Sequence, residues 1–252
     1  MIDQNSKPGS KWLESQEVFS RTSTDLFNAT AGKEVDVFAG AMDLLHACFE
    51  KDSLEGENSP EEKICLAMLS QAYQQLVSCW LDLRSGRLAA AANQWRSISE
   101  TPDFVLAAIE DANFAREWAD PNRQRTLTPG QARKIAKRRL NRIKEGMGDA
   151  WAKRRSRDAT MYQPYSHFSS SAAGLTILKP DPSSAGHFFT PEGAYSPLIR
   201  EAAKHTALLA IDVISFSSLA LGKVMTIEWH EKVQEASVKG QVILKREGAQ
   251  KG

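Results

Sequence analysis

The sequence predicts an all-α protein, one helical domain spanning residues 1–252 and built as a bundle of six to eight helices. Apolar residues recur at helical spacing over most of the chain. Hydrophobic residues make up 42% of the composition, with six Trp and ten Phe, which is enough for a substantial core. Helix-start signals, in which a hydroxyl residue precedes proline, occur at Ser59-Pro60, Thr128-Pro129 and Ser196-Pro197.

Residues 1–121 form the predicted acidic helical part, with ten basic and twenty acidic side chains. Helical periodicity predicts helices over residues 12–29, 34–49, 60–83 and 88–118. We expect Pro102 to kink or break the last of these, because its ring displaces the preceding turn and removes one hydrogen-bond donor.

Residues 122–158 are predicted to form a basic helix. Between Arg123 and Arg157 thirteen Lys and Arg face only two acids, in a protein whose net charge is +1. The apolar residues of 132–147 fall within one arc of about 140°, so the cations occupy the remaining surface. The predicted binding residues on this surface are Arg133, Lys134, Lys137, Arg138, Arg142, Arg154, Arg155 and Arg157.

Three functions are compatible with this charge pattern. A cationic helix would contact the phosphates of RNA or DNA without reading bases, and its binding would fall steeply with salt. The same surface would also suit a partner protein. In the third interpretation the acidic first half neutralises the cations, and the protein is a purely structural subunit.

The chain changes character after the basic segment. Residues 159–195 are rich in Ser, Gly and Pro and predict an irregular connection, most pronounced near 168–195. Residues 196–236 are predicted to form closing helices, followed by a tail with one short strand-like patch. The apolar run from His205 to Leu221 is too short to span a membrane and predicts a buried helix.

Two groups of residues are candidates for chemistry. Arg200 and His205 have the Arg-x4-His spacing, in which a histidine base and an arginine phosphate ligand would support metal-independent RNA cleavage. The non-catalytic alternative is that the arginine is exposed and the histidine is partly packed in the core. A second, polar cluster consists of Arg96, Glu100, Tyr162, Tyr165 and His167.

The order of these features resembles a group of bacterial helical proteins related to the HEPN superfamily. The resemblance covers residues 60–221 and rests on the helix with Arg96 and Glu100, the basic segment, the turn with Tyr162 and Tyr165-Ser166, and the closing apolar helix. The ribonucleases of that superfamily carry an Arg-x4-6-His motif, which Arg200 and His205 match. The resemblance implies an all-α bundle, a homodimer and a role in RNA metabolism or defence.

The remaining composition predicts a cytoplasmic protein without cofactors. Cys48, Cys65 and Cys79 lie in apolar helical contexts without metal-ligand spacing, so we expect reduced core thiols and no metal site. The first twelve residues contain no apolar stretch, so no signal peptide and no membrane association are expected.

Overall fold

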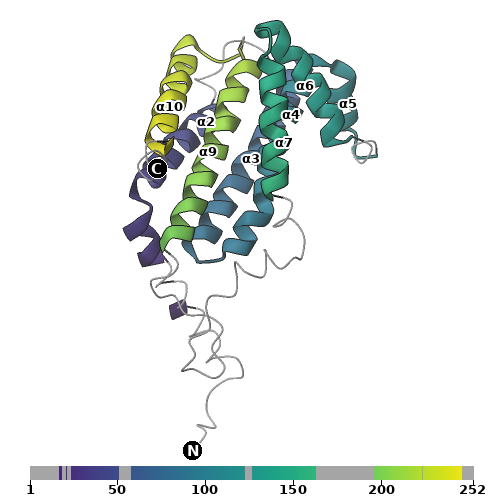
Figure 1. Cartoon of the computed structure of the whole chain (residues 1–252). Coiled ribbons are helices and arrows are strands. Elements are labelled where there is room, and N and C mark those ends of the chain that lie inside the picture. The colour runs from purple at the N-terminus through teal and green to yellow at the C-terminus, as the bar shows by residue number, and fades with distance from the viewer. Residues whose placement is uncertain are drawn as a thin grey trace, which may run out of the picture.

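The computed structural model describes residues 17–50, 58–122, 127–162 and 196–245, apart from 19–20, 22–23 and 223. The side chains of 157–162, 196–198, 241 and 243–245 also lie outside this description. Within these ranges every regular element is an α-helix, which confirms the predicted fold class (Figure 1). The predicted irregular connection near 168–195 lies outside the described residues.

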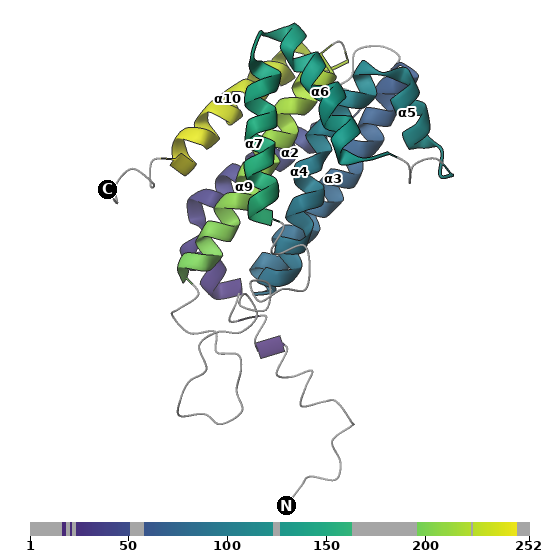
Figure 2. The same cartoon turned by 45° about the vertical axis from the view of Figure 1, so that its right-hand side comes forward.

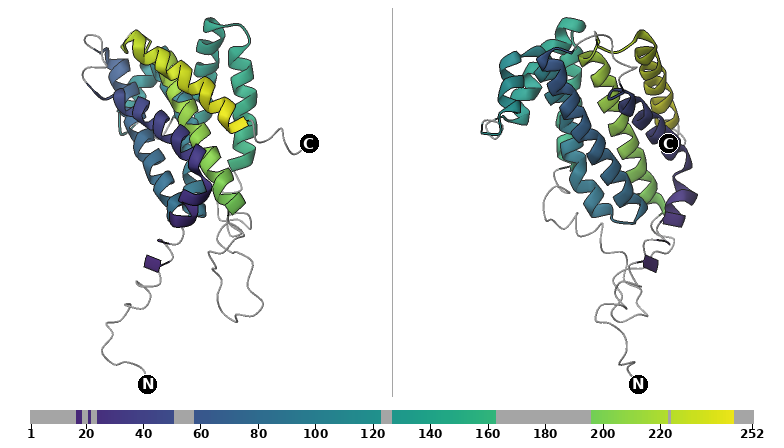
Figure 3. Two further views of the ribbon diagram at one scale, coloured as in Figure 1. Left: turned by 90° about the vertical axis from the view of Figure 1, so that its left-hand side faces the viewer. Right: turned by 180° about the vertical axis from the view of Figure 1, so that it is seen from behind.

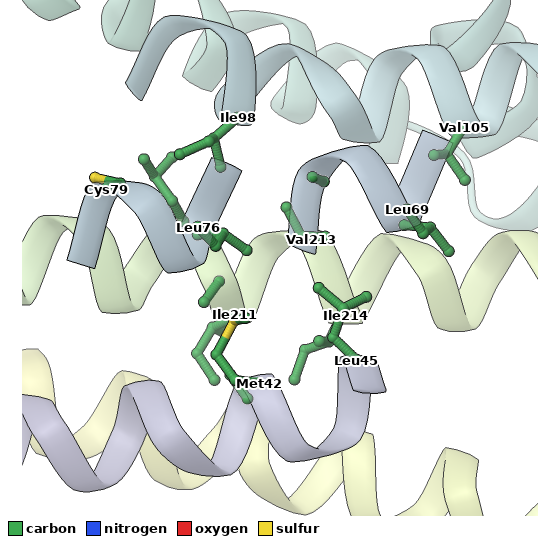
Figure 4. Close-up of a cluster of buried hydrophobic side chains, with 14 of the residues drawn as sticks. Met42, Leu45, Leu69, Leu76, Cys79, Ile98, Val105, Ile211, Val213 and Ile214 are labelled. Carbon is green, nitrogen blue, oxygen red and sulfur yellow. The ribbon is translucent and has the colours of Figure 1, made fainter. Parts of the chain in front are cut away.

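Helix α9 (Ser196–Ala220) is the centre of the bundle. It packs against α2 (Gly32–Ala47), α3 (Pro60–Arg84), α4 (Leu88–Glu110) and α10 (Ile227–Lys245). Because neighbours surround it, α9 needs apolar side chains on several faces, which explains its long apolar run. Figure 4 shows the resulting core, where Ile211, Val213 and Ile214 of α9 meet side chains from α2, α3 and α4.

Helix α3 begins where its capping sequence predicts. The Ser59 hydroxyl accepts a hydrogen bond from the Glu62 amide at 3.2 Å, and the Glu62 carboxylate accepts one from the Ser59 amide at 2.7 Å. Pro60 occupies the first turn, where its missing N–H leaves no bond unmade. The cap therefore fixes the start of the helix that packs on both α4 and α9.

Of the kink or break expected at Pro102, the break does not occur. Helix α4 continues through Pro102 to Glu110, and its packing against α3, α6 and α9 outweighs the local cost of the proline. The chain breaks instead at Asp111, whose carboxylate accepts hydrogen bonds from the amides of Asn113 and Phe114 at 3.0 and 3.2 Å. This cap starts the separate short helix α5 (Ala112–Ala119).

The C-terminal predictions also need correction. The closing helices do not end at 236, and the expected strand-like patch is part of α10, which runs to Lys245. Gly240 explains how the helix continues there. A Cβ atom at this position would lie 3.1 Å from Ile211 and 3.2 Å from Val37, so glycine allows α10 to pack closely onto α9 and α2.

Candidate functional site

The basic segment is a helical hairpin and not the single helix that we predicted. Helices α6 (Pro129–Ile143) and α7 (Met147–Tyr162) are joined by a tight turn in which Gly146 has a φ of 77°. The Gly148 amide donates to the Asn141 side chain at 2.7 Å. A Cβ on Gly148 would lie 2.2 Å from the Lys137 carbonyl oxygen, so only glycine permits this close helix contact. Figure 2 shows the hairpin beside α4.

Asp103 of α4 is the main attachment point of this hairpin. Its side chain is fully buried, and the Trp151 indole donates to Oδ1 at 2.7 Å. Arg133 of α6 and Arg155 of α7 each place Nε 3.4 Å from Oδ2. Arg155 is itself only 2% exposed. These two predicted phosphate ligands are therefore turned inward, where they balance a buried carboxylate.

Four further cations of the hairpin have partners within the chain. Glu110 of α4 lies 3.6 Å from Arg139 and also pairs with Arg142. Arg139 in addition donates to the Leu219 carbonyl at 2.9 Å, and its burial lowers its pKa. Lys137 pairs with Asp149 at 2.6 Å, and this hydrogen bond lowers the pKa of the Asp149 carboxyl.

Arg154 completes this set by pairing with Asp212 in the middle of α9. Asp212 is 8% exposed, so the arginine supplies the partner that an isolated carboxylate in an apolar helix requires. Three of the acids that form ion pairs with the hairpin lie outside it in sequence, namely Asp103, Glu110 and Asp212. Much of its positive charge thus stabilises the fold.

Two of the cations that remain lie on the outer side of α6. Lys134 and Arg138 are exposed, and no ion pair involves either of them among the described residues. Lys144 and Lys153 are exposed as well, and the Arg157 side chain lies outside the described residues. The surface free for an external ligand is therefore much smaller than the composition of the segment indicates.

Lys134 and Arg138 line a groove between α5 and α6, hereafter the α5–α6 groove, with a volume of about 630 Å³. Its apolar lining comes from Phe114, Leu127 and Ile135. The charged residues are separated by helix: the α5 side carries Asp111, at the helix cap, and Glu117, whereas the α6 side carries Lys134, Lys137 and Arg138. The acidic side was not among the residues predicted from the sequence. The sequence signal that could have revealed it is the N-cap residue Asp111, because this cap marks α5 as a separate helix.

Arg200 and His205 do not converge within the chain. The Arg200 guanidinium lies 3.2 Å from the buried carboxylate of Glu34 on α2. The His205 ring packs edge-on against Trp95 of α4, with the centroids 4.8 Å apart. Burial, together with the nearby charge of Arg154, lowers the pKa of His205 to about 4. The two side chains thus contact different neighbours of α9, Arg200 on α2 and His205 on α4.

The second predicted cluster is described only in part. Arg96 and Glu100 form an i,i+4 ion pair at 3.2 Å on the outer face of α4. Such an exposed pair contributes a few tenths of a kcal/mol to stability. The Tyr162 side chain, Tyr165 and His167 lie outside the described residues.

The described part of the chain shows no metal centre. Within it, no group of three or more His, Cys, Asp or Glu side chains is arranged to hold a metal ion. Cys48, Cys65 and Cys79 are buried free thiols, and burial raises the pKa of each to about 12. These cysteines are therefore protonated core residues. None of the helices that the structure describes is long and apolar enough to span a membrane.

The fold and this surface together define an all-α bundle with a basic hairpin docked on α4 and a groove of mixed charge beside it. Comparison of the chain with protein-family models, with curated proteins and with solved structures finds no match.

Proposed function

We propose that this protein is a helical binding module that takes a partner protein in the α5–α6 groove. The observation that carries the proposal is the position of the unpaired cations. Lys134 and Arg138 do not form an isolated positive surface but one side of a groove with apolar residues between its charged sides. This arrangement is typical of surfaces that bind an amphipathic helix.

The acidic side of the groove favours a protein over a nucleic acid. A polyanion in contact with Lys134 and Arg138 would also lie close to Glu117 and Asp111, which repel phosphates. A partner helix meets no such conflict, because it can present acids to α6, bases to α5 and apolar residues to Phe114 and Ile135. Charges of both signs therefore specify the ligand class.

The first experiment is an NMR titration of the full chain with three designed helical peptides. All three carry the same leucine stripe, flanked by one glutamate and one lysine row, by two glutamate rows or by two lysine rows. We expect the mixed peptide to bind most tightly and to shift the signals of Phe114, Leu127 and Ile135. The double variant Lys134→Glu/Arg138→Glu should weaken this binding at least tenfold.

The matched control is Lys153→Glu, which changes an exposed cation of α7 that does not line the groove. This variant should bind the mixed peptide as the wild type does. A uridine 20-mer serves as the nucleic-acid probe in the same titration. The proposal is wrong if the RNA shifts the groove signals while the mixed peptide does not, or if Lys153→Glu is as harmful as the double variant.

A further inference from the structure

A second groove adjoins α5 and lies between that helix, α3 and α4, with a volume of about 260 Å³. Helix α5 packs on both α3 and α4, and the right-hand view of Figure 3 shows it at the edge of the bundle. Met68, Gln71 and Gln75 of α3, Phe104 of α4 and Trp118 of α5 are among the lining residues. We call this groove the α3–α5 groove.

The α3–α5 groove meets the α5–α6 groove. Leu127 lines both of them. Phe104 in the lining of the first contacts Phe114 in the lining of the second, with ring centroids 5.8 Å apart. On α5, Phe114 and Trp118 are four residues apart and therefore on one face of the helix, and each lines one of the grooves. A chain that leaves one groove over Leu127 therefore reaches the other without leaving the protein surface.

The chemistry of the α3–α5 groove differs from that of its neighbour. Met68 is buried, and Phe104 and Trp118 are partly buried against the core, so these three supply apolar surface. Among the described residues, Glu100 is the only charged one in the lining, and it pairs with Arg96 at 3.2 Å. The α5–α6 groove, in contrast, carries charges on both sides. A ligand that continues from one groove into the other therefore changes from charged to neutral.

Two carboxamides of the α3–α5 groove have hydrogen-bonding groups to spare. Gln71 and Gln75 are four residues apart on α3 and thus lie on the same face. The Ser97 hydroxyl donates to Oε1 of Gln75 at 3.1 Å and so orients this side chain. The Nε2 group of Gln75 and the Gln71 side chain make no hydrogen bond with the described part of the chain. A carboxamide offers a donor and an acceptor, the same pair that a peptide group presents.

We infer that the α3–α5 groove takes an extended segment of the same partner whose helix occupies the α5–α6 groove. This inference rests on the proposed function and extends it. A helix bonds most of its backbone N–H and C=O groups internally, whereas an extended segment leaves them exposed for Gln71 and Gln75. Alternate side chains of an extended segment point to opposite sides, so one row packs on Phe104 and Trp118.

The partner helix runs antiparallel to α6 in this arrangement. Leu127 immediately precedes the Thr128 cap, so the junction of the two grooves lies at the positive end of the α6 dipole. The C-terminal end of a partner helix carries a partial negative charge and is therefore favoured there. The extended segment thus follows the helix in the sequence of the partner.

The test compares three peptides in NMR titrations of the full chain. The first is the helical peptide with one glutamate and one lysine row. The second adds a C-terminal Thr-Val-Thr-Val tail, and the third adds an alanine tail of the same length, which favours helix. The Thr-Val tail should tighten binding about tenfold, the gain that two hydrogen bonds supply, and should shift the indole signal of Trp118. The alanine tail should do neither.

The variant Gln71→Ala/Gln75→Ala tests the residues that read the tail. It should abolish the gain in affinity from the Thr-Val tail and leave the affinity for the first peptide unchanged. The matched control is Gln74→Ala/Gln234→Ala, which changes two exposed glutamines that line neither groove, and it should keep the gain. Circular dichroism verifies that both variants fold.

The possible outcomes separate this inference from the proposed function. If the first peptide binds but the Thr-Val tail adds no affinity, or if the alanine tail adds as much, the inference is wrong and the proposed function stands. A control variant as harmful as Gln71→Ala/Gln75→Ala would also overturn the inference alone. If no peptide binds, the proposed function and the inference are both wrong.

Discussion

At the scale of single residues, buried polar side chains determine how the helices fit together. Trp95 of α4 donates its indole hydrogen to the Thr206 hydroxyl at 3.0 Å, and Thr206 in turn donates to the Ala202 carbonyl at 2.9 Å. His205, the residue before Thr206 on α9, packs its ring against the same tryptophan. This cluster fixes the rotation of α9 relative to α4, because each polar group needs its partner when water is excluded.

The buried position of His205 predicts a specific pH dependence of stability. Its pKa is about 4 in the folded chain and about 6.5 in the unfolded chain, so only the unfolded state takes up a proton between these values. Stability from this residue is fully present above pH 6.5 and is lost as the pH falls toward 4. The loss should reach roughly 3 kcal/mol at most.

Urea unfolding at pH 7.5 and pH 5 measures this effect, with His205→Gln as the comparison. Glutamine does not titrate, so the variant should lose less free energy of unfolding than the wild type between the two pH values. Equal losses in both proteins would show that His205 is not held in its neutral form by burial.

At the scale of secondary-structure elements, the α6–α7 hairpin depends on a close helix contact at Gly148. The Lys137 carbonyl oxygen of α6 occupies the space that a side chain at position 148 would need. Any residue other than glycine forces the two helices apart, and Arg133 and Arg155 then no longer reach Asp103 together. The glycine thus couples the hairpin geometry to its ion pairs.

We predict that Gly148→Ala destabilises the chain by more than 1 kcal/mol and speeds amide exchange in α6 and α7. The control is Gly130→Ala at the exposed start of α6, where a Cβ would meet only the Thr128 hydroxyl at 3.9 Å. Alanine is the better helix former, so this control should be neutral or slightly stabilising. Unfolding in urea and hydrogen exchange measure both, and equal behaviour of the two variants would contradict the account.

The helix starts could be predicted from the sequence wherever a cap uses neighbouring residues. Ser59 and Thr128 both form the capping boxes that their sequences indicate. The expected break at Pro102 and the expected C-terminal strand were wrong for one shared reason. Each outcome depends on contacts with helices distant in sequence, which local periodicity does not contain.

The candidate site was predictable only in part for the same reason. The cations of α6 and α7 were identified by composition, but their orientation depends on acids 30 to 58 residues away, from Asp103 of α4 to Asp212 of α9. Periodicity showed which side of α6 is apolar. It could not show that Arg133 lies at the edge of that side, within reach of a buried carboxylate.

At the scale of the whole molecule, part of the unequal charge of the two halves is balanced by ion pairs within the fold. The acidic first part supplies Asp103 and Glu110, and the basic hairpin supplies four of the arginines that pair with them. These pairs dock the hairpin on α4. What remains for a ligand is a groove of mixed charge and not a continuous positive face.

A buried carboxylate holds the basic hairpin on the bundle, and the decisive measurement is the unfolding free energy of Asp103→Asn. Asparagine keeps the acceptor for Trp151 but removes the buried negative charge that pairs with Arg133 and Arg155. We predict a loss of about 3 kcal/mol in urea unfolding. The exposed pair partner Asp149→Asn, which changes a carboxylate at the surface of the same hairpin, should have little effect. A stability of Asp103→Asn equal to that of the wild type would contradict the account.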